Sequence, residues 1–268
     1  MRLKLDMHVH TEKSFDCLQT VEEIASACKK NGLDGVCICD HFVSREEDIQ
    51  IIDGVLIIPG VELNTNEGHM LGYCTDGKVE IADTLVKAAE NIKSANGVAV
   101  LAHPYERAID PAEIVEKRLD MLEGLIDGIE VENGRADMYV YDANIKARAQ
   151  AKIRRKRTFG GSDAHFTCEL GNAYTELEID CESLNDITLE KLRSALLNNG
   201  ADAYLSKRSK HINSARSQYI RRKKGGASLK VWCKYWLYAL KCVAYDMSWQ
   251  YNLKCEYHGK KQNRKDTD

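Results

Sequence analysis

Histidines and carboxylates recur along this chain in positions that suit metal binding. Six of the eight histidines stand at the end of a short apolar run or just after one, and several have an acidic residue nearby. Imidazole and carboxylate together suit zinc, manganese or iron, with no need for thiolate ligands. The histidines are His8, His10, His41, His69, His103 and His165, and the acidic residues near them are Asp6, Asp40, Glu62 and Asp163. These are too many for one four- or six-coordinate site, so we expect two or three divalent ions (Mn, Zn or Fe).

The spacing of the first two histidines points to a shared direction. His8 and His10 lie two residues apart in an apolar run. Because strand side chains alternate, both imidazoles would face the same side of a strand. Taken alone, the pair also fits two ordinary histidines. His41, His103 and His165 end other apolar runs in the same way, and this repetition favours one common site.

The elements that must position these residues are short strands and helices in alternation, from Met1 to about Leu205. The predicted strands are Leu3–Val9, Gly35–Cys39, Val55–Leu63, Met70–Cys74, Val98–Ala102, Gly128–Val131 and Thr158–Gly161. The predicted helices are Val21–Asn31, Ile81–Ala95, Pro111–Leu119, Asp137–Ile153 and Leu189–Asn199, with Thr20 and Thr188 as caps. Such alternation predicts a parallel sheet, and about seven units can close into a barrel. The histidines would then meet at the rim formed by the carboxyl ends of the strands.

The last part of the chain differs in composition from the rest. Residues 205–268 hold 16 Lys/Arg against 4 Asp/Glu, whereas the other 204 residues hold 22 basic and 37 acidic residues. All three tryptophans lie in this basic stretch. We therefore expect a barrel domain over residues 1–206 and a basic, Trp/Tyr-rich extension over residues 207–268.

Two patterns stand out in the predicted extension. Apolar residues recur at helical spacing: Leu229, Trp232, Cys233, Trp236, Leu240, Val243 and Met247. A helix stripe of this kind usually packs on its own domain or on a partner subunit, so an oligomer could form through it. The basic run 221–224 suits nucleic-acid phosphates, although a solvated charged face is the commoner role.

The apolar runs and the cysteines indicate in which cellular compartment the protein is expected. No run approaches the ~20 apolar residues of a membrane span, and the N-terminus has no signal-like apolar segment. The ten cysteines are scattered and form no CxxC pair, so buried thiols are favoured over disulfides or thiolate zinc. We expect a cytoplasmic protein with no membrane partner.

Seven segments, taken in order, match one known family. They are Asp6–Thr11, Ser14–Asp16, Cys39–His41, Pro59–Glu62, Gly68–Gly72, Ala102–Pro104 and Gly161–His165. Over roughly residues 2–180 the chain thus resembles the PHP (polymerase and histidinol phosphatase) superfamily, and most closely its small metal-dependent phosphoesterase branch. The resemblance implies an α/β fold, a distorted seven-stranded β/α (TIM-like) barrel, here followed by a basic, aromatic-rich helical extension.

The same resemblance divides the candidate ligands among ions. It implies one ion on His8, His10, Glu62 and Asp163, a second on Asp16, His41 and His165, and a third on Glu62, His69 and His103. Glu62 would then bridge two ions. Asp6 and Asp40 are better placed to orient imidazoles, a role that metal-bound histidines usually require.

If the chain binds closely spaced divalent ions, phosphoester hydrolysis is the reaction that we expect. Such ions lower the pKa of a bridging water and neutralise phosphoryl charge, so a metal-activated hydroxide could hydrolyse a phosphomonoester or a nucleotide phosphate. We expect Glu62 to be catalytic as the bridge. Arg135 follows a predicted strand and could grip phosphate through two donors, although a surface arginine is an equal alternative. Arg107 is a second candidate.

Three other functions stay open. Histidinol phosphatase shares the metal set, and a nuclease for short single-stranded oligonucleotides would use the basic extension. A non-catalytic metal-containing binding domain is the third, and the intact set of nine ligands argues against it. The expected partner is a small phosphorylated substrate, with a nucleotide as one candidate and nucleic acid as another.

Overall fold

The structure is a computed structural model that describes residues 1–42, 48–106 and 110–263. The chain separates into two compact units, and we describe each by itself. Met1–Ser209 is here named the barrel unit, and Lys210–Asp268 is named the extension unit. All nine candidate ligands belong to the barrel unit.

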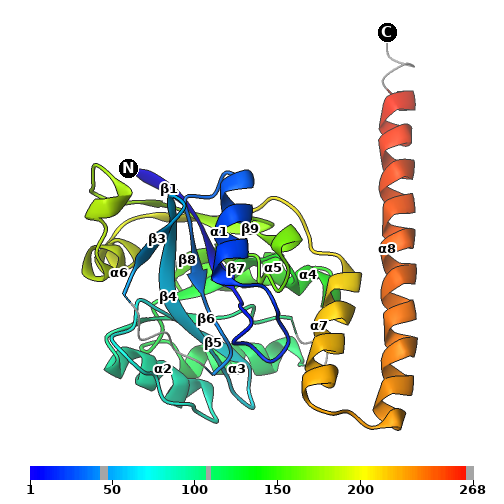
Figure 1. Ribbon diagram of the computed structural model, residues 1–268, viewed down its shortest axis with the longest axis horizontal. Coiled ribbons are helices and arrows are strands. Elements are labelled where there is room, and N and C mark those ends of the chain that lie inside the picture. The colour runs from blue at the N-terminus through cyan, green and yellow to red at the C-terminus, as the bar shows by residue number, and fades with distance from the viewer. Residues whose placement is uncertain (43–47, 107–109, 264–268) are drawn as a thin grey trace. The chain divides into compact units, whose positions relative to one another are not determined.

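A mixed sheet of ten strands forms the centre of the barrel unit (Figure 1). Nine strands follow one another in the order β10-β9-β1-β2-β4-β5-β6-β7-β8, and β3 pairs with β4 beside this path. The strands are β1 (Arg2–Val9), β2 (Gly35–Ile38), β3 (Gln50–Ile52), β4 (Val55–Asn64), β5 (His69–Tyr73), β6 (Val98–Leu101), β7 (Gly128–Asn133), β8 (Arg157–Gly161), β9 (Ala173–Glu178) and β10 (Ala201–Leu205). The path nearly closes, because a parallel bridge joins Val9 at the end of β1 to Ala164 just after β8.

Helices surround this sheet (Figure 1). They are α1 (Val21–Lys30), α2 (Leu85–Ser94), α3 (Ala112–Met121), α4 (Ala136–Tyr139), α5 (Ala143–Ile153) and α6 (Leu189–Asn198), with short 3-10 turns η1 (Thr167–Glu169) and η2 (Leu184–Asp186). Both predicted threonine caps are confirmed: the Thr20 and Thr188 side chains accept from the backbone N–H three residues on. Each cap satisfies an N–H that the first helical turn leaves without a partner.

The predicted α/β barrel is confirmed, but it contains more strands than the seven expected, and they are not all parallel. β4 and β5 pair antiparallel, as do β5 and β6, and β9 is antiparallel to both β1 and β10. β9 and β10 escaped prediction because polar residues interrupt them: Thr175 and Glu176 in β9, and Asp202 in β10. A strand with one solvated face needs no continuous apolar run.

A β-bulge in β1 directs the first two histidines towards the site. The pairing of β1 with β2 shifts register between Asp6 and Val9. Met7 belongs to the inner apolar cluster, whereas Val9 packs in the cluster that contains residues of α1. His8 and His10 therefore lie on the opposite face of the strand from Val9, which is how a bulge redirects side chains.

The extension unit consists of α7 (His211–Lys224) and α8 (Leu229–Asn263). Asp246 of α8 accepts hydrogen bonds from the backbone N–H groups of His211 and Ile212, at 2.9 Å each, and so caps α7. Tyr219 of α7 contacts the rings of Trp232 and Tyr235. These contacts pair the two helices.

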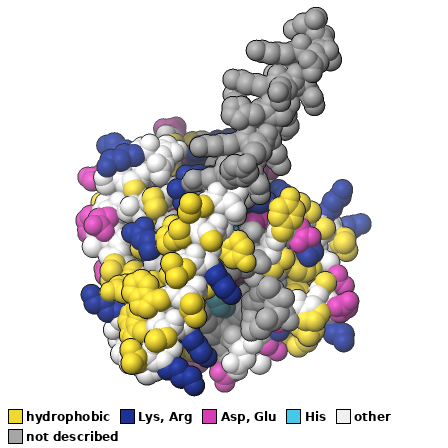
Figure 2. All heavy atoms as spheres, turned by 90° about the vertical axis from the view of Figure 1, so that its right-hand side faces the viewer, with side chains coloured by type: hydrophobic (Ala, Val, Ile, Leu, Met, Phe, Trp, Pro, Cys, Tyr) yellow, Lys and Arg dark blue, Asp and Glu magenta, His cyan; other side chains and the backbone are white. Residues whose placement is uncertain are grey.

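One face of α8 stays uncovered in the described part of the extension unit. Several residues of the predicted apolar stripe are exposed, among them Trp236 at 58% and Leu240 at 67%. Figure 2 shows hydrophobic side chains mixed with Lys and Arg on the face that is turned to the viewer. Among the described residues, no helix combines the length and apolar character needed to cross a membrane.

Closure of the barrel depends on a glycine, and this generates a first prediction. A Cβ at Gly161 would lie 2.6 Å from the backbone nitrogen of His8, which cannot give way as a flexible side chain could. We expect Gly161→Ala to lower the free energy of unfolding by at least ~2 kcal/mol, as overpacking does. Urea unfolding followed by circular dichroism measures this loss. Gly124→Ala is the control, since nothing lies within 4 Å of its added Cβ; equal stability of both variants would contradict the prediction.

Candidate metal centre

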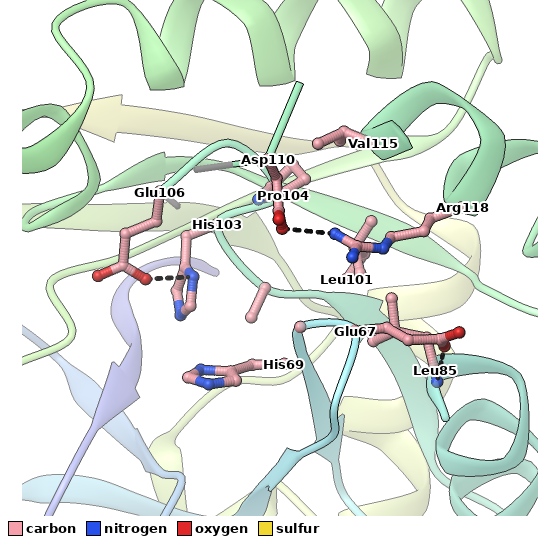
Figure 3. Close-up of a pocket in the computed structure, with 12 residues that line it drawn as sticks. Glu67, His69, Leu85, Leu101, His103, Pro104, Glu106, Asp110, Val115 and Arg118 are labelled. Atoms are coloured by element: carbon pink, nitrogen blue, oxygen red, sulfur yellow. Dashed lines mark hydrogen bonds and ion pairs between the residues drawn. The ribbon is translucent and has the colours of Figure 1, made fainter. Parts of the chain in front are cut away.

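Glu62 of β4 lies at the centre of the predicted site and is buried. One of its oxygens, Oε1, lies 2.8 Å from His69 Nδ1 and 3.3 Å from His103 Nε2. His103 turns its other ring nitrogen to Glu106, at 2.7 Å (Figure 3). Because β4, β5 and the end of β6 supply these residues, adjacent strands form the first group of possible ligands.

A second group forms at the end of β1. His8 and His10 bring their Nε2 atoms to within 3.2 Å of each other, with Glu62 oxygens at 3.6 and 3.5 Å from them. Asp163 Oδ1 lies 3.2 Å from His10 Nε2 and 3.8 Å from His8 Nε2. The rings of His8 in β1 and of His10 just after it converge, as the spacing of the two residues predicts.

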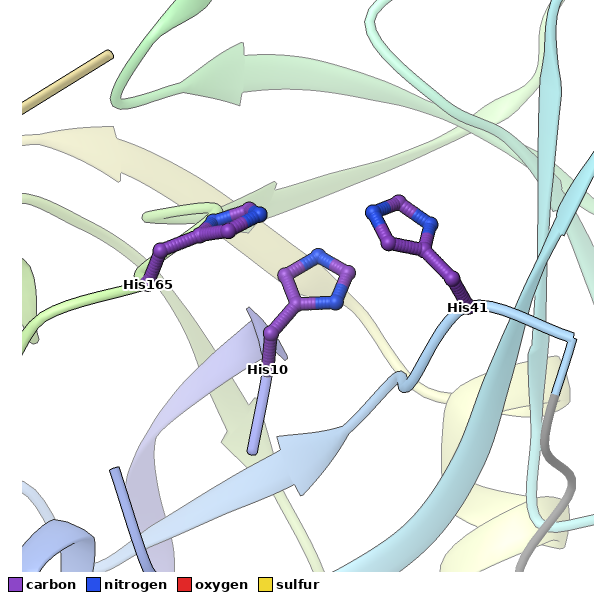
Figure 4. A group of neighbouring side chains, drawn as sticks. All are labelled: His10, His41 and His165. Carbon is purple, nitrogen blue, oxygen red and sulfur yellow. The ribbon is translucent and has the colours of Figure 1, made fainter. Parts of the chain in front are cut away.

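A third group contains His41, His165 and Asp16. The His41 and His165 rings flank His10, with ring centroids 4.4 and 4.3 Å from it (Figure 4). Asp16 Oδ1 lies 3.6 Å from His41 Nε2 and 3.3 Å from His165 Nε2. Figure 4 shows the three imidazoles converging from three separate segments of the chain.

The spacing of these atoms fits divalent ions. Two ligand atoms about 2.1 Å from a tetrahedral ion lie ~3.4 Å apart, which matches the separations within the groups. In addition, Asp16 Oδ1 and Glu62 Oε2 are buried and make no well-aligned hydrogen bond, although imidazole nitrogens lie 3.3 and 2.8 Å from them. Buried carboxylate oxygens rarely lack a donor, and a cation would satisfy them. The structure thus brings all nine predicted residues together.

Electrostatics at the site favour positive charge between these groups. Burial by itself would raise the pKa of Glu62, but the charges of His69 and His41 help to hold it well below its ordinary value. Burial, helped by the charges of His165 and His41, lowers the pKa of His10 to about 4. Although burial opposes it, Glu62 raises the pKa of His41 to about 9. Protons on some imidazoles balance the carboxylates here, and metal binding would release them.

Glu130 of β7 is a functional residue that the sequence analysis missed. Its Oε1 lies 3.0 Å from His8 Nδ1, and its Oε2 accepts from the His103 backbone N–H and from Asn133 Nδ2, both at 3.0 Å. It therefore orients candidate ligands of two groups, His8 and His103, in the way that carboxylates orient metal-bound histidines in other proteins. The only signal in the sequence was an acidic residue inside an apolar strand.

The prediction that Asp40 orients an imidazole agrees with the structure, since the Ser14 hydroxyl that it holds lies 3.2 Å from His10 Nδ1, whereas the same prediction for Asp6 was wrong. Asp6 accepts from the backbone N–H groups of Ser162 and Gly171, at 2.8 and 2.9 Å. Asp40 accepts from Thr11 N–H and from the Ser14 hydroxyl, each at 2.7 Å. Asp6 holds loops in place through backbone donors, whereas Asp40 acts through the hydroxyls of Thr11 and Ser14.

Arg135 is buried beside the site but engaged with another side chain. Its Nε and Nη2 donate to Glu169 of η1, at 3.1 and 2.5 Å. Glu169 also accepts from the His165 backbone N–H at 3.2 Å. The predicted phosphate contact of Arg135 stays a prediction, and Arg107 lies outside the described residues.

Comparison with known sequences finds a family model that matches part of the chain, and several distant relatives. Residues 142–197 match a family model described as PHP-associated. The chain is 27% identical to an uncharacterized protein of Methanocaldococcus jannaschii, over 72% of this chain and 79% of that protein. It is 29% identical to a probable phosphatase of Vibrio campbellii, over 51% of each chain. The chain thus spans about half the length of this second relative.

Solved structures share the fold. A two-domain protein of Bacteroides vulgatus, which contains a predicted PHP-like metal-dependent phosphoesterase, aligns with a TM-score of 0.53 and 20% identity, over 82% of this chain and 70% of that one. The lesion-specific endonuclease PfuEndoQ of Pyrococcus furiosus aligns with a TM-score of 0.51 and 19% identity, over 76% of this chain and 58% of that one. The chain is thus similar to PHP proteins in one segment of its sequence, residues 142–197, and it shares its fold with a protein that contains a predicted PHP-like phosphoesterase.

The position of Glu130 generates a second prediction. In Glu130→Gln an amide replaces a carboxylate that faces donors on both oxygens, so one donor loses its acceptor and the His8 ring loses its fixed orientation. We expect metal affinity to fall ~10–100-fold. Competition with a chromogenic chelator measures it.

Glu132→Gln is the matched control for this experiment. Glu132 lies two residues along the same strand, is buried, and pairs with Arg148. The same loss of metal affinity in both variants would mean that Glu130 acts through strand stability rather than through the histidines.

Proposed function

We propose that the chain hydrolyses phosphomonoesters with divalent metal ions as cofactors. The observation that carries the proposal is the position of Glu62, whose Oε1 lies 2.8 Å from His69 Nδ1 and whose Oε2 lies 3.5 Å from His10 Nε2, an imidazole of a different group. A carboxylate so placed suits two ions held close together, an arrangement used in phosphate hydrolysis. The relative named a probable phosphatase, and the fold shared with a predicted PHP-like metal-dependent phosphoesterase, support this reaction class.

The proposed ligand sets follow the three groups. They are His8, His10, Glu62 and Asp163; Asp16, His41 and His165; and Glu62, His69 and His103. Bound ions would supply an activated water at neutral pH and offset charge on the phosphoryl group. The chain's own residues hold the geometry: Glu130 orients His8, and Asp40 fixes the loop before Asp16 through the Ser14 hydroxyl.

Replacing the bridging carboxylate gives a third prediction. We expect the parent to bind two or three manganese, zinc or iron ions, measured by elemental analysis, and to hydrolyse small phosphomonoesters. Glu62→Gln should lower kcat/KM at least ~100-fold, because an amide cannot bridge two cations. Near-native turnover by a folded Glu62→Gln protein would remove Glu62 from the mechanism, and fewer than one ion per parent chain would contradict the metal centre.

The same assay tests Arg135, which we propose as a phosphate ligand. Arg135→Lys keeps the charge but loses the fork of donors that binds phosphate through two bonds. A phosphate ligand would show as a raised KM with unchanged metal content. A lower unfolding free energy with unchanged KM would restrict Arg135 to bracing Glu169.

A nuclease is the second candidate function, favoured by the charge of the extension unit. Arg221, Arg222, Lys223 and Lys224 form the last turn of α7. Basic side chains of this kind can follow the phosphates of a single strand. The fold is also shared with a lesion-specific endonuclease.

A triple substitution separates the two functions and is the fourth prediction. Changing Arg221, Lys223 and Lys224 to glutamine removes three charges and spares Arg222, which lies over the Tyr235 ring. If the phosphomonoesterase proposal is correct, the variant handles small substrates and oligonucleotides as the parent does. A nuclease would lose oligonucleotide affinity, and its log–log salt dependence would flatten by ~2 units, at about 0.7 per phosphate contact.

The control for this variant carries the same charge change on the barrel unit. Lys29, Lys30 and Lys87 are exposed helix residues and are changed to glutamine together. A selective loss on oligonucleotides in the α7 variant alone would favour the nuclease.

A further inference from the structure

A narrow pocket opens beside the group formed by Glu62, His69 and His103. It encloses about 410 Å³, its open mouth included. His69 and His103 line one side, and the ion pair of Arg118 with Asp110 lies on the other (Figure 3). A molecule in this pocket would therefore touch the proposed metal ligands at one end.

The walls between these two ends are apolar. Leu85 from α2, Leu101 from β6 and Val115 from α3 line the pocket, and each is almost fully buried. Because these side chains come from three separate elements that pack in one cluster, the walls are held in place. An apolar group that enters removes its own surface from water, which is favourable by ~25 cal/mol per Å².

The charges that line the pocket are mainly negative. Glu67, Glu106 and Asp110 are carboxylates, and Arg118 is its one Lys or Arg among the described residues. Asp110 lies 2.7 Å from the Arg118 guanidinium and so offsets its charge. A second phosphate or a carboxylate on the substrate would meet like charge here, whereas an uncharged group would not.

We propose that this pocket holds the leaving group of the substrate, and that the substrates are phosphomonoesters of apolar alcohols that carry no negative charge. The inference rests on the proposed phosphomonoesterase activity and adds the substrate class to it. The phosphate would lie at the histidine end, and the alcohol would extend between Leu101 and Val115 towards Arg118. Val115 is then a specificity-determining residue.

Three phosphate esters test the pocket. Methyl phosphate leaves it empty, 2-phenylethyl phosphate fills it, and 2-(4-carboxyphenyl)ethyl phosphate fills it with a negative tail. We expect kcat/KM for the phenylethyl ester to exceed that for methyl phosphate at least ~10-fold. The carboxylated ester should fall at least ~10-fold below the phenylethyl ester.

A change in the pocket wall should alter this selectivity. Val115→Phe fills the pocket and should lower the phenylethyl-to-methyl ratio at least ~10-fold. Ile114→Phe is the matched control, because Ile114 is the preceding residue of α3 and is exposed. If Val115→Phe does not fold, Val115→Ile adds one methyl group and should lower the ratio ~4-fold.

Binding measured by calorimetry separates the pocket from the proposed function. Hydrolysis of methyl phosphate without preference for the phenylethyl ester would overturn the pocket and leave the phosphomonoesterase standing. Tighter binding of the phenylethyl ester, lost in Val115→Phe, would support the pocket even if neither ester were hydrolysed; the proposed function would then fail. Neither preferential binding nor hydrolysis would overturn both.

Discussion

Buried carboxylates at the barrel rim must have their charge balanced, and the surrounding architecture follows from that requirement. An unbalanced buried charge costs several kcal/mol, so Glu62, Asp163 and Asp16 each need cationic partners. Imidazoles supply them, as protonated rings or as ligands of ions. The rings in turn need fixed orientations, and Glu130 provides one for His8 from inside the barrel.

The backbone at the rim is held in unusual conformations for the same purpose. His103 and Asp163 have positive φ angles of 22° and 56°, a region that side chains other than glycine rarely adopt. Each such residue costs of order 1–3 kcal/mol and persists only where its surroundings determine it. For His103, the bond from its N–H to Glu130 is one such constraint. His103 and Asp163 therefore combine a strained backbone with side chains that balance charge at the rim.

The sequence was informative where function limits residue type, and silent where it does not. The convergence of His8 and His10 could be predicted because strand side chains alternate between two faces. That rule is local, so the spacing of the two residues is enough to apply it. The role of Glu130 could not be predicted, because its partners lie 122 and 27 residues away in the chain. The role of Asp6 could not be predicted either. Its two oxygens accept from the backbone N–H groups of Ser162 and Gly171, which come close only when the barrel closes.

In the proposed function, different kinds of residue determine the reaction type and the choice of substrate. Metal ligands must be histidine, aspartate or glutamate, so their motifs stand out in a chain of any composition. Leu85, Leu101 and Val115 also belong to the apolar core, and nothing in their type or spacing distinguishes a pocket wall from a packed interior. Only the three-dimensional position of Val115, next to a cluster of proposed ligands and an ion pair, gives it a possible role in specificity. A pocket wall can therefore change within a family while every metal motif stays the same, and relatives with the same ligands can act on different phosphate esters.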